Sequence, residues 1–146
     1  VCSSSVADYF QLAMIGLCQT SSIYCTPYDA EYILKINTIQ GTVKKLDNVE
    51  LPETSGLLWT SGALAPDNNI YYMSSYARRI MRLSPDNDSL TSVGDDLGDG
   101  RKYSGTVVGN DNCVYGIPDE ATRIVKYNPA GNSGATESIV NTYNEL

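Results

Sequence analysis

The sequence predicts an all-β fold made of three copies of one antiparallel unit, and three observations support this prediction. First, residues 23–37, 70–84 and 114–128 align without a gap, at a period of about 45 residues. Second, β-branched residues and tyrosines cluster between turns rich in Asn, Asp, Gly and Pro, a pattern typical of strands. Third, no copy contains a long stretch with apolar positions at i, i+3, i+4 and i+7, which excludes helical repeats of similar length.

The copies share similar side chains at four aligned positions. The aligned sets are Tyr24, Tyr71 and Tyr115; Ala30, Ala77 and Ala121; Ile33, Ile80 and Ile124; and Lys35, Arg82 and Lys126. The chain of 146 residues is long enough for one compact domain. A unit repeated three times, however, buries its core between neighbouring copies instead of around one centre.

Composition excludes several classes of protein. The apolar fraction of 42% excludes a disordered chain, and the longest uncharged apolar run, residues 9–18, is shorter than the roughly 20 residues that span a bilayer. The net charge is −7, so most of the surface would repel a phosphate backbone. The chain has no histidine, which removes the usual general base and zinc ligand. We therefore expect no nucleic-acid partner, no membrane span and no cofactor.

Each copy is predicted to begin with a hairpin. Residues 1–12 precede the first copy and are expected to form a leader segment. The sequences PDNN and GNDN lie in the second and third turns, where Asp, Asn and Gly favour a turn because they tolerate left-handed backbone angles. The predicted hairpins join residues 14–18 to 23–25, residues 63–65 to 70–72, and residues 106–108 to 114–115.

Two further strands complete each copy. In the third strand of the first copy, Ile33 and Lys35 share one face while Leu34 and Ile36 share the other. We expect each basic stem to lie along apolar neighbours with its charge in water. The third strands are predicted at residues 32–36, 79–83 and 123–127, and the fourth strands at residues 42–46, 89–93 and 136–140.

Four strands in about 45 residues form the pattern of a β-propeller blade. The predicted blades cover about residues 13–58, 59–101 and 102–140, and residues 141–146 form a C-terminal tail. The predicted fold is therefore β-propeller-like, with three four-stranded antiparallel blades that form a partial propeller or half of a closed one.

Segments of the third copy resemble a known type of repeat. KYSGTVV at 102–108, VYGIP at 114–118 and ATRIV at 121–125 are similar to the GKWSGGVLAPNGKIYGIP blade repeats of predicted propeller proteins from microalgae. WTSGALAP at 59–66 with IYY at 70–72 matches less closely, and the first copy matches least. The resemblance extends over roughly residues 13–140. It implies the propeller architecture and assigns no catalytic residues.

Three blades are too few for a closed ring, because closed propellers have about 4 to 8. An open stack would leave the flanks of its outer sheets exposed. A longer parent chain, a second copy that closes three plus three blades into six, or another subunit could cover them. The degenerate first copy and the poorly defined last strand favour a complete small subunit.

The propeller geometry also predicts a rim of loops. The loops that follow the second strand of each blade emerge on the same face as the connections between blades. Aromatic rings beside carboxylates on that face would suit a sugar or peptide ligand. For Trp59 and Tyr103, packing between blades is the favoured interpretation, because both occupy the same position of the repeat. The candidate ligand-binding residues are Tyr28, Trp59, Tyr76, Arg78, Tyr103, Asp119 and Glu120.

An acidic cluster offers carboxylates of the kind that Ca²⁺ prefers. It contains Asp95, Asp96 and Asp99, but it lacks the calcium-loop pattern that ends in a bidentate Glu. A solvated turn is the favoured interpretation, and residues 86–88 are likewise interpreted as an ordinary turn. We therefore predict no metal site, with these three aspartates as the calcium candidates.

The four cysteines, Cys2, Cys18, Cys25 and Cys113, are irregularly spaced. The expected register of the first hairpin makes Cys18 and Cys25 a diagonal pair within reach of a disulfide, with buried thiols as the alternative. Cys113 has no partner within its own copy. No paired C-x2-C spacing occurs, which excludes a four-cysteine zinc site.

The sequence favours an interaction module over an enzyme. A Ser-His-Asp arrangement needs histidine, and paired carboxylates such as Asp119 and Glu120 are the remaining route to glycoside hydrolysis. We therefore expect a non-enzymatic propeller-type scaffold that assembles with another subunit or a second copy. The alternatives are a carbohydrate-binding, lectin-like propeller and, more remotely, a carboxylate-based hydrolase. The absent initiator methionine and the glycosylation sequon at Asn87 favour secretion or an organelle lumen.

Overall fold

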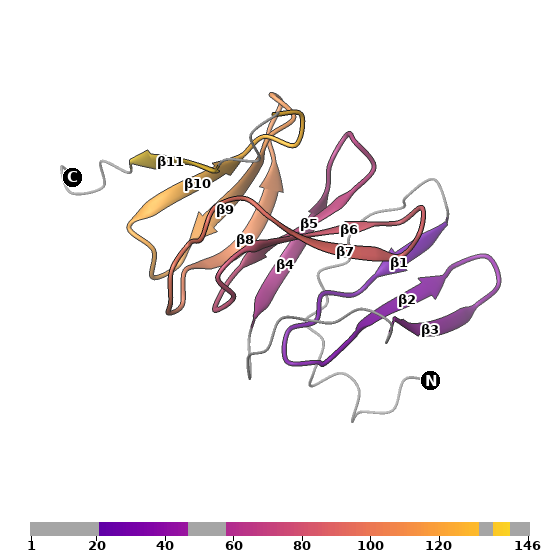
Figure 1. The fold of residues 1–146 in the computed structure, drawn as a ribbon. Helices are drawn as coiled ribbons and strands as arrows, with labels where there is room; N and C mark the ends of the chain where they lie inside the picture. Colours follow the sequence, from indigo (N-terminus) through magenta and orange to yellow (C-terminus); the bar gives the residue numbers. More distant parts are fainter. Residues whose placement is uncertain (1–20, 47–57, 132–135, 141–146) are drawn as a thin grey trace.

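The computed structural model describes residues 21–46, 58–131 and 136–140 of the chain, and these residues form three antiparallel sheets. We call the sheets the first, second and third blade in chain order (Figure 1). The first blade contains β1 (Ser22–Tyr24), β2 (Ile33–Asn37) and β3 (Thr42–Leu46). The second contains β4 (Trp59–Leu64), β5 (Ile70–Ser74), β6 (Ile80–Ser84) and β7 (Ser89–Val93). The third contains β8 (Tyr103–Val108), β9 (Val114–Pro118), β10 (Arg123–Tyr127) and β11 (Thr136–Val140).

Every blade is an up-and-down meander in which each strand pairs with its neighbour in the chain. The blades stand side by side, with the second blade between the other two, and β4 lies next to β8 (Figure 1). This arrangement confirms the predicted all-β, β-propeller-like fold. Within the described ranges, no helix is long and apolar enough to cross a membrane.

The hairpin turns form where the sequence places Asp, Asn and Gly. Asn68 and Asn112 lie at equivalent positions of two turns and have positive φ angles of 61° and 63°, which Asn tolerates better than most residues. In each turn, an aspartate side chain accepts a hydrogen bond from the backbone N–H of the residue two positions later. Asp67 accepts from Asn69 at 3.1 Å, and Asp111 accepts from Cys113 at 3.2 Å. The same turn chemistry is therefore used twice.

Four strands have their predicted bounds, whereas β4 and β8 begin earlier than predicted. Residues 42–46, 89–93, 123–127 and 136–140 are strands as predicted. β4 and β8, however, begin at Trp59 and Tyr103, earlier than the predicted 63–65 and 106–108. Each has a register shift near its start, between Trp59 and Ser61 and between Tyr103 and Gly105. Their Gly- and Ser-rich beginnings lack the apolar alternation by which strands are predicted. The predicted strand 14–18, the leader and the tail lie outside the described residues.

The apolar core lies between the blades as two clusters. β5 contributes to both, because Ile70 and Tyr72 face the first blade while Tyr71 and Met73 face the third. The second blade is therefore buried on both faces. In β2, Ile33 and Lys35 share one face, as predicted. The structure shows that this face meets the second blade, because Ile33 belongs to the first cluster and Lys35 bonds to Asp88.

The connections between blades repeat one hydrogen-bond arrangement. The carbonyl of Leu58 accepts the N–H groups of Ser75 and Ala77, at 2.8 and 3.3 Å. The carbonyl of Lys102, one blade later, accepts those of Asp119 and Ala121, at 2.9 and 3.1 Å. In the second and third blades, Ala77 and Ala121 thus mark the point where the loop after the second strand is tied to the start of its own blade.

Candidate functional site: the blade flanks and the loop rim

The outward face of the third blade exposes apolar side chains. We call Val107, Tyr115 and Ile117 the open flank; Val107 is 46% and Ile117 48% exposed. Tyr115 pairs with Val107 across the β8–β9 ladder, and Ile117 pairs with Gly105. The equivalents of Tyr115 and Ile117 in the second blade are Tyr71 and Met73, which are buried against the third blade.

The outward face of the first blade carries a row of aliphatic side chains. We call Ile23, Ile36 and Val43 the first-blade flank; they are successive ladder partners across β1, β2 and β3. Val43 is 60% exposed. The equivalent row in the second blade is Ile70, Leu83 and Leu90, likewise successive ladder partners. In that row Ile70 and Leu83 are fully buried, and Leu90 packs against the same cluster.

A charged contact joins the first and second blades. Asp88, in the turn between β6 and β7, accepts hydrogen bonds from the Tyr24 hydroxyl at 2.9 Å and the Lys35 ammonium at 2.7 Å. Lys44 lies 3.6 Å from its other oxygen. Burial alone would raise the pKa of Asp88, but the bonds from Lys35 and Tyr24 outweigh it and lower that pKa. Burial raises the pKa of Tyr24 to about 12.

Asp88 corrects the interpretation of residues 86–88 as an ordinary turn. They do form a turn, and Asp88 adopts a positive φ of 55°, but its carboxylate also binds the neighbouring blade. The repeat gave no signal for this role, because the aligned residues in the other copies are Gly41 and Asn132.

The contact between the second and third blades uses a hydroxyl and an aromatic pair. The Thr106 hydroxyl accepts the Met73 N–H at 3.1 Å and donates to the Ser61 carbonyl at 3.0 Å. The rings of Tyr71 and Tyr127 lie 5.5 Å apart and are tilted by 45°. Neighbouring blades are thus held by apolar packing with a few buried or half-buried polar bonds.

Each blade also repeats a tyrosine opposite a basic residue. Tyr24 pairs with Lys35, Tyr71 with Arg82, and Tyr115 with Lys126 across the ladders. On the open flank, Asp111 accepts a hydrogen bond from the Tyr115 hydroxyl at 2.8 Å and pairs with Lys126 at 3.1 Å. These two bonds lower the pKa of Asp111 and keep it ionised. The charges of Asp111 and Lys126 beside the open flank therefore neutralise each other.

The structure divides the predicted rim residues into buried and exposed groups. Trp59 and Tyr103 are buried in the two apolar clusters, so they are packing residues and offer no ring to a ligand. This corrects their inclusion in the rim, and it follows from their shared place in the repeat. Tyr76 is 41% exposed. Tyr28 is half-buried, Glu120 is exposed, and Asp119 is exposed beside Arg101, with which it forms an ion pair.

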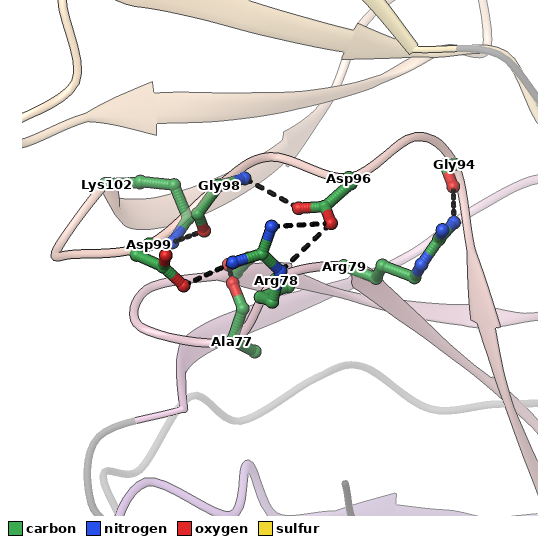
Figure 2. A network of polar contacts seen from close by, with 9 residues as sticks. Ala77, Arg78, Arg79, Gly94, Asp96, Gly98, Asp99 and Lys102 are labelled. Atoms are coloured by element: carbon green, nitrogen blue, oxygen red, sulfur yellow. Dashed lines mark hydrogen bonds and ion pairs between the residues drawn. The ribbon is translucent and has the colours of Figure 1, made fainter. Parts of the chain in front are cut away.

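The acidic cluster is neutralised from within the chain. Figure 2 shows the Arg78 guanidinium between the carboxylates of Asp96 and Asp99. Lys102 is buried, and its ammonium donates to the carbonyls of Gly98 at 3.0 Å and Gly100 at 2.7 Å. Burial lowers the pKa of Lys102. Arg78 and Lys102 therefore already bind carboxylate oxygens of Asp96 and Asp99 and carbonyl oxygens of Gly98 and Gly100, which a metal cation would need as ligands.

No group of three or more His, Cys, Asp or Glu side chains that could hold a metal ion occurs in the part of the chain that the structure describes. Asp95 is exposed, and Asp96 of the same cluster forms an ion pair with Arg78. Cys25 and Cys113 are buried. Cys2 and Cys18 lie outside the described residues, so the pairing of Cys18 with Cys25 stays a prediction.

Comparisons with known proteins identify the fold. No protein-family model matches the chain, and no curated protein matches it. Solved structures that resemble it include virginiamycin B lyase from Staphylococcus aureus, with 17% identity over 83% of this chain and 38% of that one, and a TM-score of 0.67. Hydrazine synthase from Kuenenia stuttgartiensis matches with 13% identity, 83% and 34% coverage, and a TM-score of 0.63.

A third similar structure is an auxiliary nutrient binding protein from Bacteroides ovatus, with 16% identity, 83% and 34% coverage, and a TM-score of 0.58. The likeness to these three proteins supports the β-propeller-like fold alone, because the identities are low. The chain spans only 34% to 38% of the length of these neighbours.

Proposed function

We propose that the chain is a non-enzymatic propeller-type interaction module that assembles with a further sheet through its outer blade flanks. One comparison between equivalent residues supports this most directly. Ile117 is 48% exposed on the open flank, whereas Met73 is 1% exposed between the second and third blades. A surface that is covered in one copy of the repeat and open in the next needs a covering partner, because exposed apolar sheet surface promotes aggregation.

Burial of the open flank can supply part of the free energy of binding. Complete burial of an exposed Val or Ile side chain contributes about 1.5–3 kcal/mol. Val107 and Ile117 are each about half exposed, so roughly half of that amount is available from each. Specific interfaces bury about 1,200–2,000 Å² in total. The two side chains would therefore form the centre of a contact that extends over the whole face of the sheet.

Ion pairs of the candidate carboxylates support the non-enzymatic part of the proposal. Asp96 and Asp99 are paired with Arg78, and Asp119 is paired with Arg101. A general acid needs a proton near neutral pH, and the Gly98 N–H and Arg78 lower the pKa of Asp96 instead. The sequence also contains no histidine.

Chemical labelling in the protein's native cells tests whether the open flank is covered. We compare an Ile117→Cys variant with Ile39→Cys as the matched control, because Ile39 is 80% exposed in the turn between β2 and β3. A permeable maleimide is added, and labelling at each position is measured by peptide mass spectrometry. We expect Cys at position 117 to react at least tenfold more slowly than Cys at position 39 in cells, and at a comparable rate after urea unfolding. Equal rates in folded protein would contradict the proposal.

Carbohydrate binding is the second candidate function. It is supported by the exposed ring of Tyr76, which belongs to the same loop after β5 as Arg78, and by the likeness to a nutrient-binding protein. An aromatic ring can stack on the apolar face of a sugar while charged groups fix its orientation. The rim that remains for such a ligand consists of Tyr28, Tyr76, Arg78, Asp119 and Glu120.

A titration with a panel of common mono- and disaccharides at millimolar concentration separates the two functions. If the rim binds sugar, Tyr76→Ala should weaken binding about tenfold, while Tyr76→Phe, which keeps the ring, should retain it. Calorimetry measures both. Heat changes that are absent for every sugar, or unaffected by Tyr76→Ala, would count against a carbohydrate site at this rim.

A further inference from the structure

The two interfaces inside the chain follow one plan. The face of a blade that carries the repeated tyrosine packs against the opposite face of the blade that follows. Tyr24 of the first blade lies in one cluster with Leu83 of the second. Tyr71 of the second blade contacts Tyr127 of the third. Leu83 and Tyr127 occupy the same position of the repeat, one residue after the basic side chain.

Among the described residues, nothing covers either half of this interface at the two ends of the stack. The open flank presents the tyrosine-bearing half, with Tyr115 in the place of Tyr71. The first-blade flank presents the other half, with Ile36 in the place of Leu83. The open flank and the first-blade flank are therefore the two complementary halves of one interface, and a single chain carries both.

We infer that the open flank binds the first-blade flank of a second copy, so that two chains close head to tail into a six-bladed ring. This inference rests on the proposed function, since it names the partner of the same surface. In the ring, each chain uses both of its flanks once. Two-fold symmetry makes the two contacts identical and leaves no free end from which a fibre could grow.

Ring size agrees with the lengths of similar structures. The match with virginiamycin B lyase uses 83% of this chain but only 38% of the lyase, a ratio of about 2.2. The lyase is therefore somewhat more than two chains long, and two copies of three blades would approach that size. Six blades also lie within the range of about 4 to 8 found in closed propellers.

The charges near both flanks permit close contact. Lys126 is paired with Asp111 beside the open flank, and the Lys45 ammonium lies 4.0 Å from the centre of the Tyr32 ring on the first blade. Burial of an unpaired charge is costly. Asp111 already compensates the charge of Lys126, whereas Lys45 keeps its charge over the Tyr32 ring and would lie at the edge of the contact or face an acidic group of the second copy. The rows that meet would be mainly aliphatic and aromatic.

Light scattering after size-exclusion chromatography tests the inference on the purified full chain. We expect a mass of twice 15.9 kDa at micromolar concentration. Ile117→Asp and Val43→Asp each place a charge on one half of the contact and should weaken the dimer at least about a hundredfold. Ile39→Asp, on an exposed turn outside both flanks, should leave it unchanged. Circular dichroism checks that each variant keeps its sheet content.

The outcomes separate this inference from the proposed function. A dimer that survives Val43→Asp but not Ile117→Asp would be a contact between two open flanks, and it would overturn the head-to-tail ring. A monomer at every concentration would overturn the second copy as partner. If Cys at position 117 is nevertheless protected in cells, the proposed function stands with a different protein as partner; if it is not protected, both fail.

Discussion

At the scale of single residues, Asp88 has a role that its neighbours in sequence do not share. It receives bonds from Tyr24, 64 positions away, and from Lys35, 53 positions away. Its side chain is only 16% exposed, so the two bonds are shielded from water and are stronger than bonds on the surface. Asp67 and Asp111, by contrast, accept hydrogen bonds from tyrosines only four residues away, in the strands that follow their turns.

Replacing Asp88 should therefore separate the first blade from the second. We expect Asp88→Asn to lower the free energy of unfolding by about 1.5–3 kcal/mol, because hydrogen bonds to a charged group are lost. Asp86→Asn, in the same turn but exposed, is the matched control and should change little. Urea unfolding followed by tyrosine fluorescence measures both. Equal effects of the two substitutions would contradict the assigned role of Asp88.

The same residue predicts how stability depends on pH. The pKa of Asp88 is lower in the folded chain than its ordinary value of 3.8. The stabilisation is therefore fully present above pH 3.8 and is lost as pH falls through the folded pKa. Repeating the unfolding experiment between neutral pH and pH 3 should bring the stability of the wild type closer to that of Asp88→Asn. A difference between them that stays constant over this range would contradict the prediction.

At the scale of elements, β9 shows how closely the second and third blades approach. Gly116 lies on the face of β9 that meets the second blade, and a Cβ atom there would lie 2.8 Å from Met73 Cγ and from Val125 Cγ1. Gly105, on β8, would direct a Cβ only toward the side chain of Ile117 on the open flank. In the β8–β9 pair, the interface between the blades thus requires a glycine at position 116, whereas Gly105 lies beside the exposed open flank.

This difference is testable with two substitutions of equal size. We expect Gly116→Ala to destabilise the fold by about 1–3 kcal/mol, because the extra methyl group overpacks the interface. Gly105→Ala should cost less, since the exposed end of Ile117 can move away. Thermal unfolding monitored by circular dichroism compares them. If both variants melt at the same temperature, the close approach at Gly116 is not what limits packing between these blades.

The elements also show where prediction from sequence succeeded. β3, β7, β10 and β11 have the predicted bounds because period-two alternation or turn residues mark them locally. β4 and β8 begin earlier than predicted, since Gly, Ser and Thr near their starts carry no apolar pattern. These strands form because β8 packs beside β4 and the Thr106 hydroxyl bonds across to Ser61 and Met73. Such contacts leave no trace in the local sequence.

At the scale of the whole molecule, stability comes from contacts between blades. Among the described residues, the second blade has two such contacts and the first and third blades have one each. The second blade is buried on both faces, whereas Val43 and Ile117 are exposed on the outer faces of the other two. In a stack of this kind, each blade is stabilised mainly by its neighbours. A closed ring would give the outer blades the contact that the middle blade already has, which is the reason to expect assembly.

The sequence by itself determined the three copies, most strand positions and the β-propeller-like class, because these depend on the order of apolar, turn-forming and basic residues along a short stretch. Only the tertiary structure decided that Trp59 and Tyr103 are buried, that Arg78 holds Asp96 and Asp99, and that Asp88 joins two blades. Each of these facts depends on which copy a side chain faces. Partners tens of residues apart in the chain meet only after the sheets have packed.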